Sequence, residues 1–323
     1  MVGTGERTMV PDDLLSDVFR HVEIHGVISG GIAACAPWVS SGEVSDDVKI
    51  VAVLRGQAHL RADGGVSAHL AEGDVAVLGR RSWLALRSGA QRESAREIAP
   101  PVGWTRLPLD PASQPDVVVG GHVQLGPRGR ELLHSVLPPV GHIRGSAPGA
   151  SRLRTVLDLL LQEFSGGDVG SGFAVSQYAQ LLVLEVLRAY ADQAGLSPGW
   201  LRLLSNEQLR PAVQLMHDDP GHPWRLEQLA RAATMSRTTF AESFRRTSGL
   251  PPLVYLRRWR IVLAERALRH TDTSVDALAA RLGYASPNSF STAFRRTIGV
   301  PPLTYRRAHA KTVSGPAQTT IPD

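Results

Sequence analysis

The feature that most constrains this chain is a pattern that its C-terminal third contains twice. The first copy runs from Leu226 to Arg258 and the second from Val275 to Arg307. From Phe240 onward the copies align at an offset of fifty residues, so that phenylalanines, an arginine pair, a glycine, a proline pair and a tyrosine recur in one order. A repeat of this kind indicates two copies of one supersecondary unit.

Each copy predicts a pair of short helices. Apolar residues recur at helical spacing over 226–233 and again over 275–282. A tight break follows, and Ser236 and Ser286 are candidate N-caps for a second helix. The phenylalanines of that helix lie four residues apart and therefore face inward together. The pair predicts a helix-turn-helix, whose second helix enters the major groove of DNA.

A long helix is predicted over 252–270, between the two units. A rigid helix there fixes their separation, so that both second helices meet one face of a duplex about one helical turn apart. Upstream of the first unit, Ser205 or Asn206 is expected to cap a helix that runs to about His217 and ends at 219–221.

The doubled pattern F-x-x-x-F-R-R-x-x-G-x-P-P-x-x-Y resembles the AraC/XylS family of transcription regulators, over about 100 C-terminal residues. The resemblance implies sequence-specific binding to double-stranded DNA and places base contacts at exposed positions of each second helix. Asn side chains pair with adenine, Arg reaches guanine or phosphate, and Glu accepts from cytosine. The predicted base-contacting residues are Arg237, Thr238, Ala241, Glu242, Asn288, Ser289, Ser291 and Thr292.

Charge follows the repeat. Residues 205–311 carry 17 Lys and Arg against 8 Asp and Glu, whereas the rest of the chain carries 18 against 22. This asymmetry is typical of a polyanion-binding module joined to a neutral or acidic domain. The arginine pairs that end each second helix are assigned to backbone phosphates, which give affinity without sequence choice: Arg245, Arg246, Arg295 and Arg296.

The N-terminal part has a different pattern. From Val27 to about Val123, short β-prone runs alternate with Gly, Asp and Pro, which predicts an all-β sandwich or barrel. Asp63-Gly64-Gly65 is a hairpin turn by its composition. The order of these runs, with an L-x-x-G-D turn from Leu70 to Asp74, resembles the cupin-type barrel that opens many AraC-family regulators. Residues 88–115 are predicted to be a long loop, and a short helix and a Pro/Gly turn follow the last strand.

Cupin enzymes hold a metal with histidines, and here the corresponding positions are Val51 and Leu84. His59 and His69 lie on neighbouring predicted strands, but two imidazoles alone make a poor metal site. We therefore expect no catalytic residue, no metal and no cofactor. The alternative is a cupin-type metalloenzyme that carries a DNA-binding module, and a third possibility is a nonspecific architectural DNA binder.

Four N-terminal residues are candidates for sensing. Trp38, Trp83 and Trp104 either line a pocket for a small effector or belong to the core or a dimer surface. Cys35 is the single cysteine, which excludes an internal disulfide. It is interpreted as inert packing in an apolar strand, with redox sensing as the alternative.

Two apolar helices are predicted over 151–164 and 173–194. The family resemblance implies that such helices pair across a two-fold axis in a homodimer; the alternative is that they pack only on their own barrel. RNA polymerase and an unknown small-molecule effector are further expected partners. The chain shows no signal peptide or membrane span, so a cytoplasmic protein is expected.

The predicted fold class is α+β multidomain, with a cupin-like β-barrel and helices followed by an all-α double helix-turn-helix. The expected domains are a regulatory barrel, a helical dimerisation or linker segment, a DNA-binding domain and a disordered tail, at residues 1–145, 146–204, 205–311 and 312–323 respectively.

Overall fold

The computed structural model describes residues 15, 16, 18, 19, 24–89, 95–100, 113–125, 130, 137, 140–166, 168–191 and 198–310. They form two compact units: Glu23–Leu201, called the N-terminal unit, and Arg202 onward together with the described residues before 23, called the C-terminal unit. The predicted α+β class is confirmed, because the first unit is rich in sheet and the second is helical. Trp104 and the predicted tail at 312–323 lie outside the described residues.

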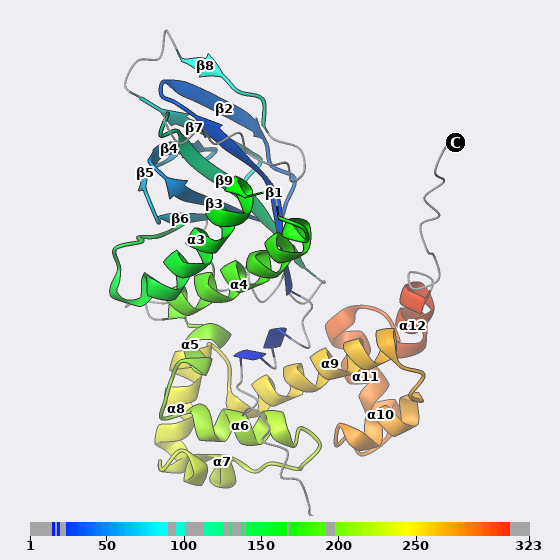
Figure 1. Cartoon of the computed structure of the whole chain (residues 1–323). Coiled ribbons are helices and arrows are strands. Elements are labelled where there is room, and N and C mark those ends of the chain that lie inside the picture. Colours follow the sequence, from blue (N-terminus) through cyan, green and yellow to red (C-terminus); the bar gives the residue numbers. More distant parts are fainter. Residues whose placement is uncertain are drawn as a thin grey trace, which may run out of the picture. The chain divides into compact units, whose positions relative to one another are not determined.

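Two five-stranded sheets build the N-terminal unit (Figure 1). The first sheet has the order β1 (Ile24–Ala34), β9 (Asp116–Leu125), β3 (Val48–Arg55), β6 (Val75–Gly79) and β10 (Val140–Ile143). The second has the order β5 (Val66–Ala71), β4 (Gln57–Ala62), β7 (Trp83–Ser88), β2 (Trp38–Glu43) and β8 (Arg96–Glu97). A double sheet of this kind is the arrangement expected of the cupin class.

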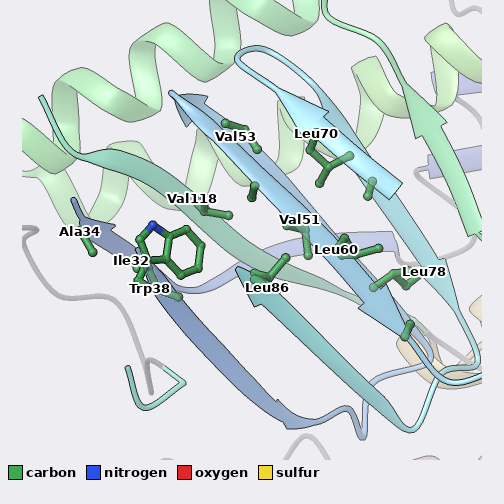
Figure 2. Packing of buried hydrophobic residues seen from close by; sticks show 13 residues of the cluster. Ile32, Ala34, Trp38, Val51, Val53, Leu60, Leu70, Leu78, Leu86 and Val118 are labelled. Atoms are coloured by element: carbon green, nitrogen blue, oxygen red, sulfur yellow. The ribbon is translucent and has the colours of Figure 1, made fainter. Parts of the chain in front are cut away.

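An apolar core fills the space between the sheets (Figure 2). Trp38, Leu60 and Leu70 are fully buried there. The indole Nε1 of Trp38 donates to Asp116 Oδ2 at 2.9 Å, which satisfies the one polar atom of this ring.

Two helices cover the other face of the first sheet. Helix α4 (Ser171–Ala191) packs on β1 and α3 (Ser151–Ser165) packs on β3. A methyl group at Gly26 would collide with the carbonyl oxygen of Ala179, so glycine permits the close approach of α4. Strands β3 and β6 are therefore covered on both faces, which explains their nearly uninterrupted apolar sequences.

Most predicted strands are confirmed, as is the hairpin turn, in which Gly64 and Gly65 both have φ 75°. The predicted loop over 88–115 is wrong in part, because it contains β8, and the Pro/Gly turn is wrong because β10 lies there. Strand β2 was not predicted. Its second half is Ser-Ser-Gly-Glu, which has no β pattern, and it is held by ladder bonds to β7 that the sequence does not show.

Helix α5 (Trp200–Leu204) includes the boundary between the two units. The C-terminal unit contains α6 (Arg210–Asp218), α7 (Leu226–Ala232), α8 (Arg237–Ser248), α9 (Pro252–His270), α10 (Val275–Arg281), α11 (Pro287–Ile298) and α12 (Pro302–Ala310). The predicted bounds of the long connecting helix, now α9, are confirmed. The predicted N-cap of α6 is wrong, because the helix begins at Arg210 with Pro211 in its first turn. Asn206 Oδ1 instead accepts from the amide of Leu209 in the preceding turn.

Both helix-turn-helix units have the predicted caps. Ser236 and Ser286 accept backbone amides at the starts of α8 and α11, and Gly249 and Gly299 end these helices with φ 78° and 92°. The four repeated phenylalanines are fully buried, as their spacing predicts: Phe240, Phe244, Phe290 and Phe294.

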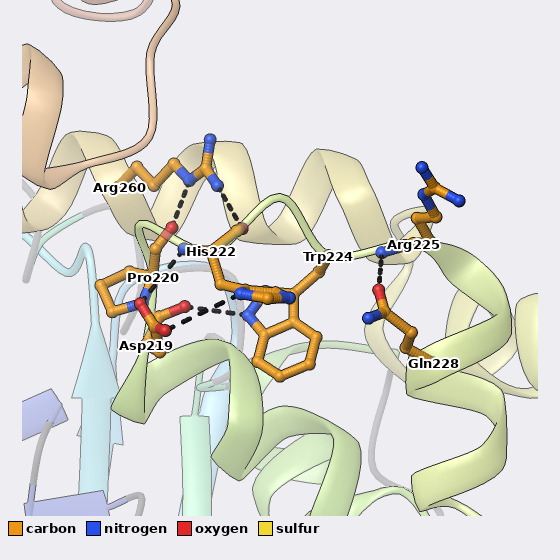
Figure 3. Close-up of polar contacts among 7 residues, drawn as sticks. All are labelled: Asp219, Pro220, His222, Trp224, Arg225, Gln228 and Arg260. Atoms are coloured by element: carbon orange, nitrogen blue, oxygen red, sulfur yellow. Dashed lines mark hydrogen bonds and ion pairs between the residues drawn. The ribbon is translucent and has the colours of Figure 1, made fainter.

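A single arginine of α9 joins the two helix-turn-helix units. The guanidinium of Arg260 donates from Nε to the Pro220 oxygen at 2.6 Å and from Nη2 to the His222 oxygen at 3.0 Å, both just before α7 (Figure 3). Its Nη1 donates to the oxygen of Gly283, in the turn between α10 and α11, at 3.3 Å. Only 9% of Arg260 is exposed. One side chain thus bonds the loops of both units.

Two glycines meet at the same point. A methyl group at Gly283 would collide with the carbonyl oxygen of Gly221, and one at Gly221 would collide with that of Arg281. Gly283 also has φ 70°, a conformation that glycine adopts without strain. The two units therefore touch through bare backbone, and we call this contact, with Arg260, the junction.

Replacing Arg260 by methionine is expected to lower the free energy of opening of the C-terminal unit by about 2 to 4 kcal/mol, because three carbonyl oxygens lose a charged donor. Native-state hydrogen exchange of the amides in α9 and α10 measures this change. Arg258→Met, on the exposed face of the same helix, is the control and should change it by less than about 0.5 kcal/mol. Equal effects of the two substitutions would contradict the role of the junction.

Candidate nucleic-acid interface

The N-terminal turns of α8 and α11 present the residues predicted to contact bases. Six of the eight are exposed, and Ala241 and Ser291 are half-buried. Thr238 and Glu242 of α8, and Asn288 and Thr292 of α11, lie on the side of the helix opposite the buried phenylalanine pair. The helical period that buries the phenylalanines therefore also presents these side chains, and their assignment to individual bases stays a prediction.

Two of these side chains already have partners within the protein. Arg237 Nη1 lies 3.1 Å from Glu227 Oε1 of α7, in an ion pair whose two side chains are 67% and 50% exposed. Ser289 Oγ donates to the carbonyl oxygen of Ser286 and accepts its amide, which closes a capping box. The Ser289 hydroxyl thus holds the start of α11, whereas the Asn288 side chain forms no hydrogen bond within the described part of the chain.

Arg245, Arg246, Arg295 and Arg296 occupy the last turns of α8 and α11, where a positive charge also complements the helix dipole. All four are exposed. None of them has an ion pair with another described residue. They are free to bind phosphates.

Helix α9 sets the separation of the two units. It has 19 residues, and at 1.5 Å per residue it is roughly 28 Å long. Successive major-groove segments on one face of B-DNA lie about 34 Å apart. The length of α9 is therefore of the same order as one turn of the duplex.

The N-terminal unit contains a cavity between its two sheets, with a volume of about 90 Å³. Lys49 lies at its border, where its Nζ is 3.1 Å from Ser29 Oγ and 3.5 Å from Asp46 Oδ2. The Ser29 hydroxyl is also 2.9 Å from His122 Nδ1. The cavity is therefore apolar with one polar end.

A larger groove of about 370 Å³ lies on the outer face of the second sheet. Trp38 and Trp83 both border it, although Trp38 belongs to the core and Trp83 is 37% exposed. Arg61 and Arg87, which no sequence motif marks, line it as well. The alternation of inward and outward residues along β4 and β7 was the signal that could have found them.

His59 and His69 face each other across β4 and β5, and no group of three or more metal-binding side chains occurs among the residues that the structure describes. The interpretation of Cys35 as strand packing is wrong: it follows the end of β1, is exposed, and donates to the carbonyl oxygen of Ser113. None of the described helices is both long and apolar enough to cross a bilayer.

Comparison with known proteins covers both units. A cupin family matches residues 13–192, and a helix-turn-helix domain family matches residues 229–308. An AraC-like transcription regulator from Streptomyces lividans is 33% identical over 283 residues, which cover 85% of this chain and 91% of that protein.

Two further proteins match parts of the chain. The RCS-specific transcriptional activator RclR of Escherichia coli is 32% identical over 174 residues, covering 52% of this chain and 60% of the activator. The solved DNA-binding domain of AdpA, in complex with a target DNA, is 35% identical and matches with a TM-score of 0.33, covering 34% of this chain and all of that domain. On its two family matches and its full-length relative, the chain belongs to the AraC family of helix-turn-helix transcription regulators, with an N-terminal cupin domain.

Proposed function

We propose that one protomer reads two successive major-groove segments of an operator, with α8 in one and α11 in the other. The observation that carries this proposal is the junction, because Arg260 and the paired glycines couple the two units at the middle of α9. Without such a coupling, two tethered helix-turn-helix units would lose affinity to the entropy of ordering them on DNA.

The second unit has the chemistry for reading bases. Asn288 is exposed at the start of α11 and has an amide that pairs with adenine. Acidic side chains lie near the first unit's positions, since Glu242 is exposed on α8 and Glu227 holds Arg237. In the proposal α11 supplies most of the base discrimination, and the arginine pairs supply phosphate contacts in both units.

The proposal includes a homodimer formed through α4. Its outward side carries Phe173, 73% exposed, and Leu181, 42% exposed, two helical turns apart. Tyr178 and Leu184 are half-buried beside them. Apolar side chains exposed along one helix stripe are typical of a surface that another apolar surface covers, and a second copy offers the same stripe across a two-fold axis.

In the proposed mechanism the protein acts in the cytoplasm by binding and not by catalysis. The N-terminal unit responds to a small effector, and the DNA-bound protein acts on transcription through RNA polymerase. The full-length relative, itself a transcription regulator, supports a regulatory and non-enzymatic role.

Substitutions in α11 should separate affinity from specificity. Arg295→Ala is expected to weaken binding to all sequences alike and to reduce the salt slope by about 1, whereas Asn288→Ala should remove about 1 to 3 kcal/mol of discrimination. Fluorescence anisotropy at several salt concentrations measures both, on a fragment selected from genomic DNA and on its scrambled version. Arg152→Ala, on α3, is the control. If Asn288→Ala lowers the affinity for both fragments by a similar factor, Asn288 has no role in base reading.

Charges placed on the stripe of α4 should separate the protomers. The double substitution Phe173→Asp and Leu181→Asp is expected to convert a dimer into a monomer, because two buried carboxylates per protomer would lose their hydration. Sedimentation equilibrium gives the mass, and thermal unfolding verifies that the variant is folded. Gln162→Asp, at an exposed position of α3, is the control and should leave the dimer intact. If the double variant sediments with the same mass as the wild-type dimer, this face of α4 is not the dimer interface.

A further inference from the structure

The groove on the outer face of the second sheet has an unusual lining. Alternation along β4 and β7 sends Leu60 and Leu86 into the core, and the residues between them outward. The outward set combines two arginines, a histidine and an aromatic ring: Arg61, Arg87, His59 and Trp83.

Three basic side chains, those of His69, His59 and Arg87, lie in one row across the sheet. His59 is directly opposite His69 on one side and directly opposite Arg87 on the other. Arg61 follows two residues after His59 and points to the same face. Groups of like charge in opposite positions destabilise a sheet. Consistent with this, burial, Arg87, His69 and Arg61 all lower the pKa of His59.

No carboxylate offsets this charge among the residues that the structure describes. Neither Arg61 nor Arg87 forms an ion pair there, and the buried Nε of Arg87 has no hydrogen-bond partner. The nearest acid at the end of β4, Asp63, accepts the amide and the hydroxyl of Ser82. Glu43 and Glu97 are exposed at the β2 edge of this face and pair with neither arginine. The two guanidinium groups thus carry positive charge that no described carboxylate neutralises, and an anion in the groove would neutralise it.

The groove also has the size and the surface for an organic ligand. Its volume of about 370 Å³ falls in the range of small-molecule sites, and is about four times that of the cavity between the sheets. Trp83 offers a partly exposed ring at the border of the groove. Guanidinium groups bind carboxylate and phosphate with two parallel hydrogen bonds, and an indole face stacks on planar rings.

We propose that this groove is a binding site for a small anionic molecule with a planar ring, whose carboxylate or phosphate lies on Arg61 and Arg87 and whose ring lies on Trp83. The proposal rests on the effector response proposed above and gives that response a ligand chemistry and a place. Because binding is measured without DNA, failure of this site leaves the DNA-binding proposal untouched.

Calorimetric titration of the full chain tests the site with phenyl phosphate, inorganic phosphate and phenol as probes. We expect phenyl phosphate to bind most tightly. Arg61→Met and Arg87→Met should each weaken it by about tenfold or more, the effect of losing a charged hydrogen bond. Trp83→Leu should weaken the binding of phenyl phosphate by about threefold to tenfold and leave the binding of inorganic phosphate unchanged. Arg152→Met on α3 is the matched control and should have no effect.

A second measurement distinguishes loss of the binding site from a purely structural effect of the arginine substitutions. Bound anion neutralises the positive groups around His59, so phenyl phosphate should raise the pKa of this imidazole in a proton NMR titration, and phenol should not. Arg61 is exposed, so its substitution tests the site even where a variant of Arg87 unfolds. The proposal is overturned when phenyl phosphate shows no saturable binding at about 1 mM, or binds equally well to the Arg61 and Arg152 variants.

Discussion

The junction is the constraint on which the DNA-binding half of this protein depends. Two helix-turn-helix units of this size bury little surface each, and a helix that connects them could still bend or twist. Arg260 opposes such motion, because it donates to carbonyl oxygens before α7 and after α10 at once, while the paired glycines let the two backbones touch. Since its guanidinium is largely excluded from water, these bonds are stronger than the same bonds on a surface.

The N-terminal unit leaves two surfaces of distinct chemistry. Its first sheet is covered by the core on one face and by α3 and α4 on the other, so neither face is an open surface. Among the described residues no helix covers the outer face of the second sheet, and the residues on that face include the row of His69, His59 and Arg87. Helix α4 has one apolar stripe more than its own sheet can cover. An apolar stripe suits a second copy, whereas a basic groove suits an anion.

The sequence predicted the C-terminal unit better than the N-terminal one, for physical reasons. Local signals mark α8, α9 and α11: a serine cap and a terminal glycine on α8 and α11, and a proline in the first turn of α9 and α11. Strand β2 depends on ladder bonds to β7, which are distant in sequence, and the row of basic residues becomes visible only when register brings β5, β4 and β7 together. The junction was missed because nothing in the pattern distinguishes Arg260 from its exposed neighbours Arg257 and Arg258.

The ion pair between Arg237 and Glu227 favours unequal roles for the two units. An exposed pair of this kind contributes at most about 1 kcal/mol, so a base or phosphate can displace Glu227 at small cost. Each displacement nevertheless leaves a carboxylate close to the negatively charged duplex, and Glu242 adds another on the same face. The attraction between Arg237 and a guanine or phosphate must therefore exceed this repulsion before Arg237 increases the affinity for DNA. Asn288 carries no such cost, because its amide is neutral and forms no hydrogen bond with another described residue, and the proposal therefore assigns most of the base discrimination to α11.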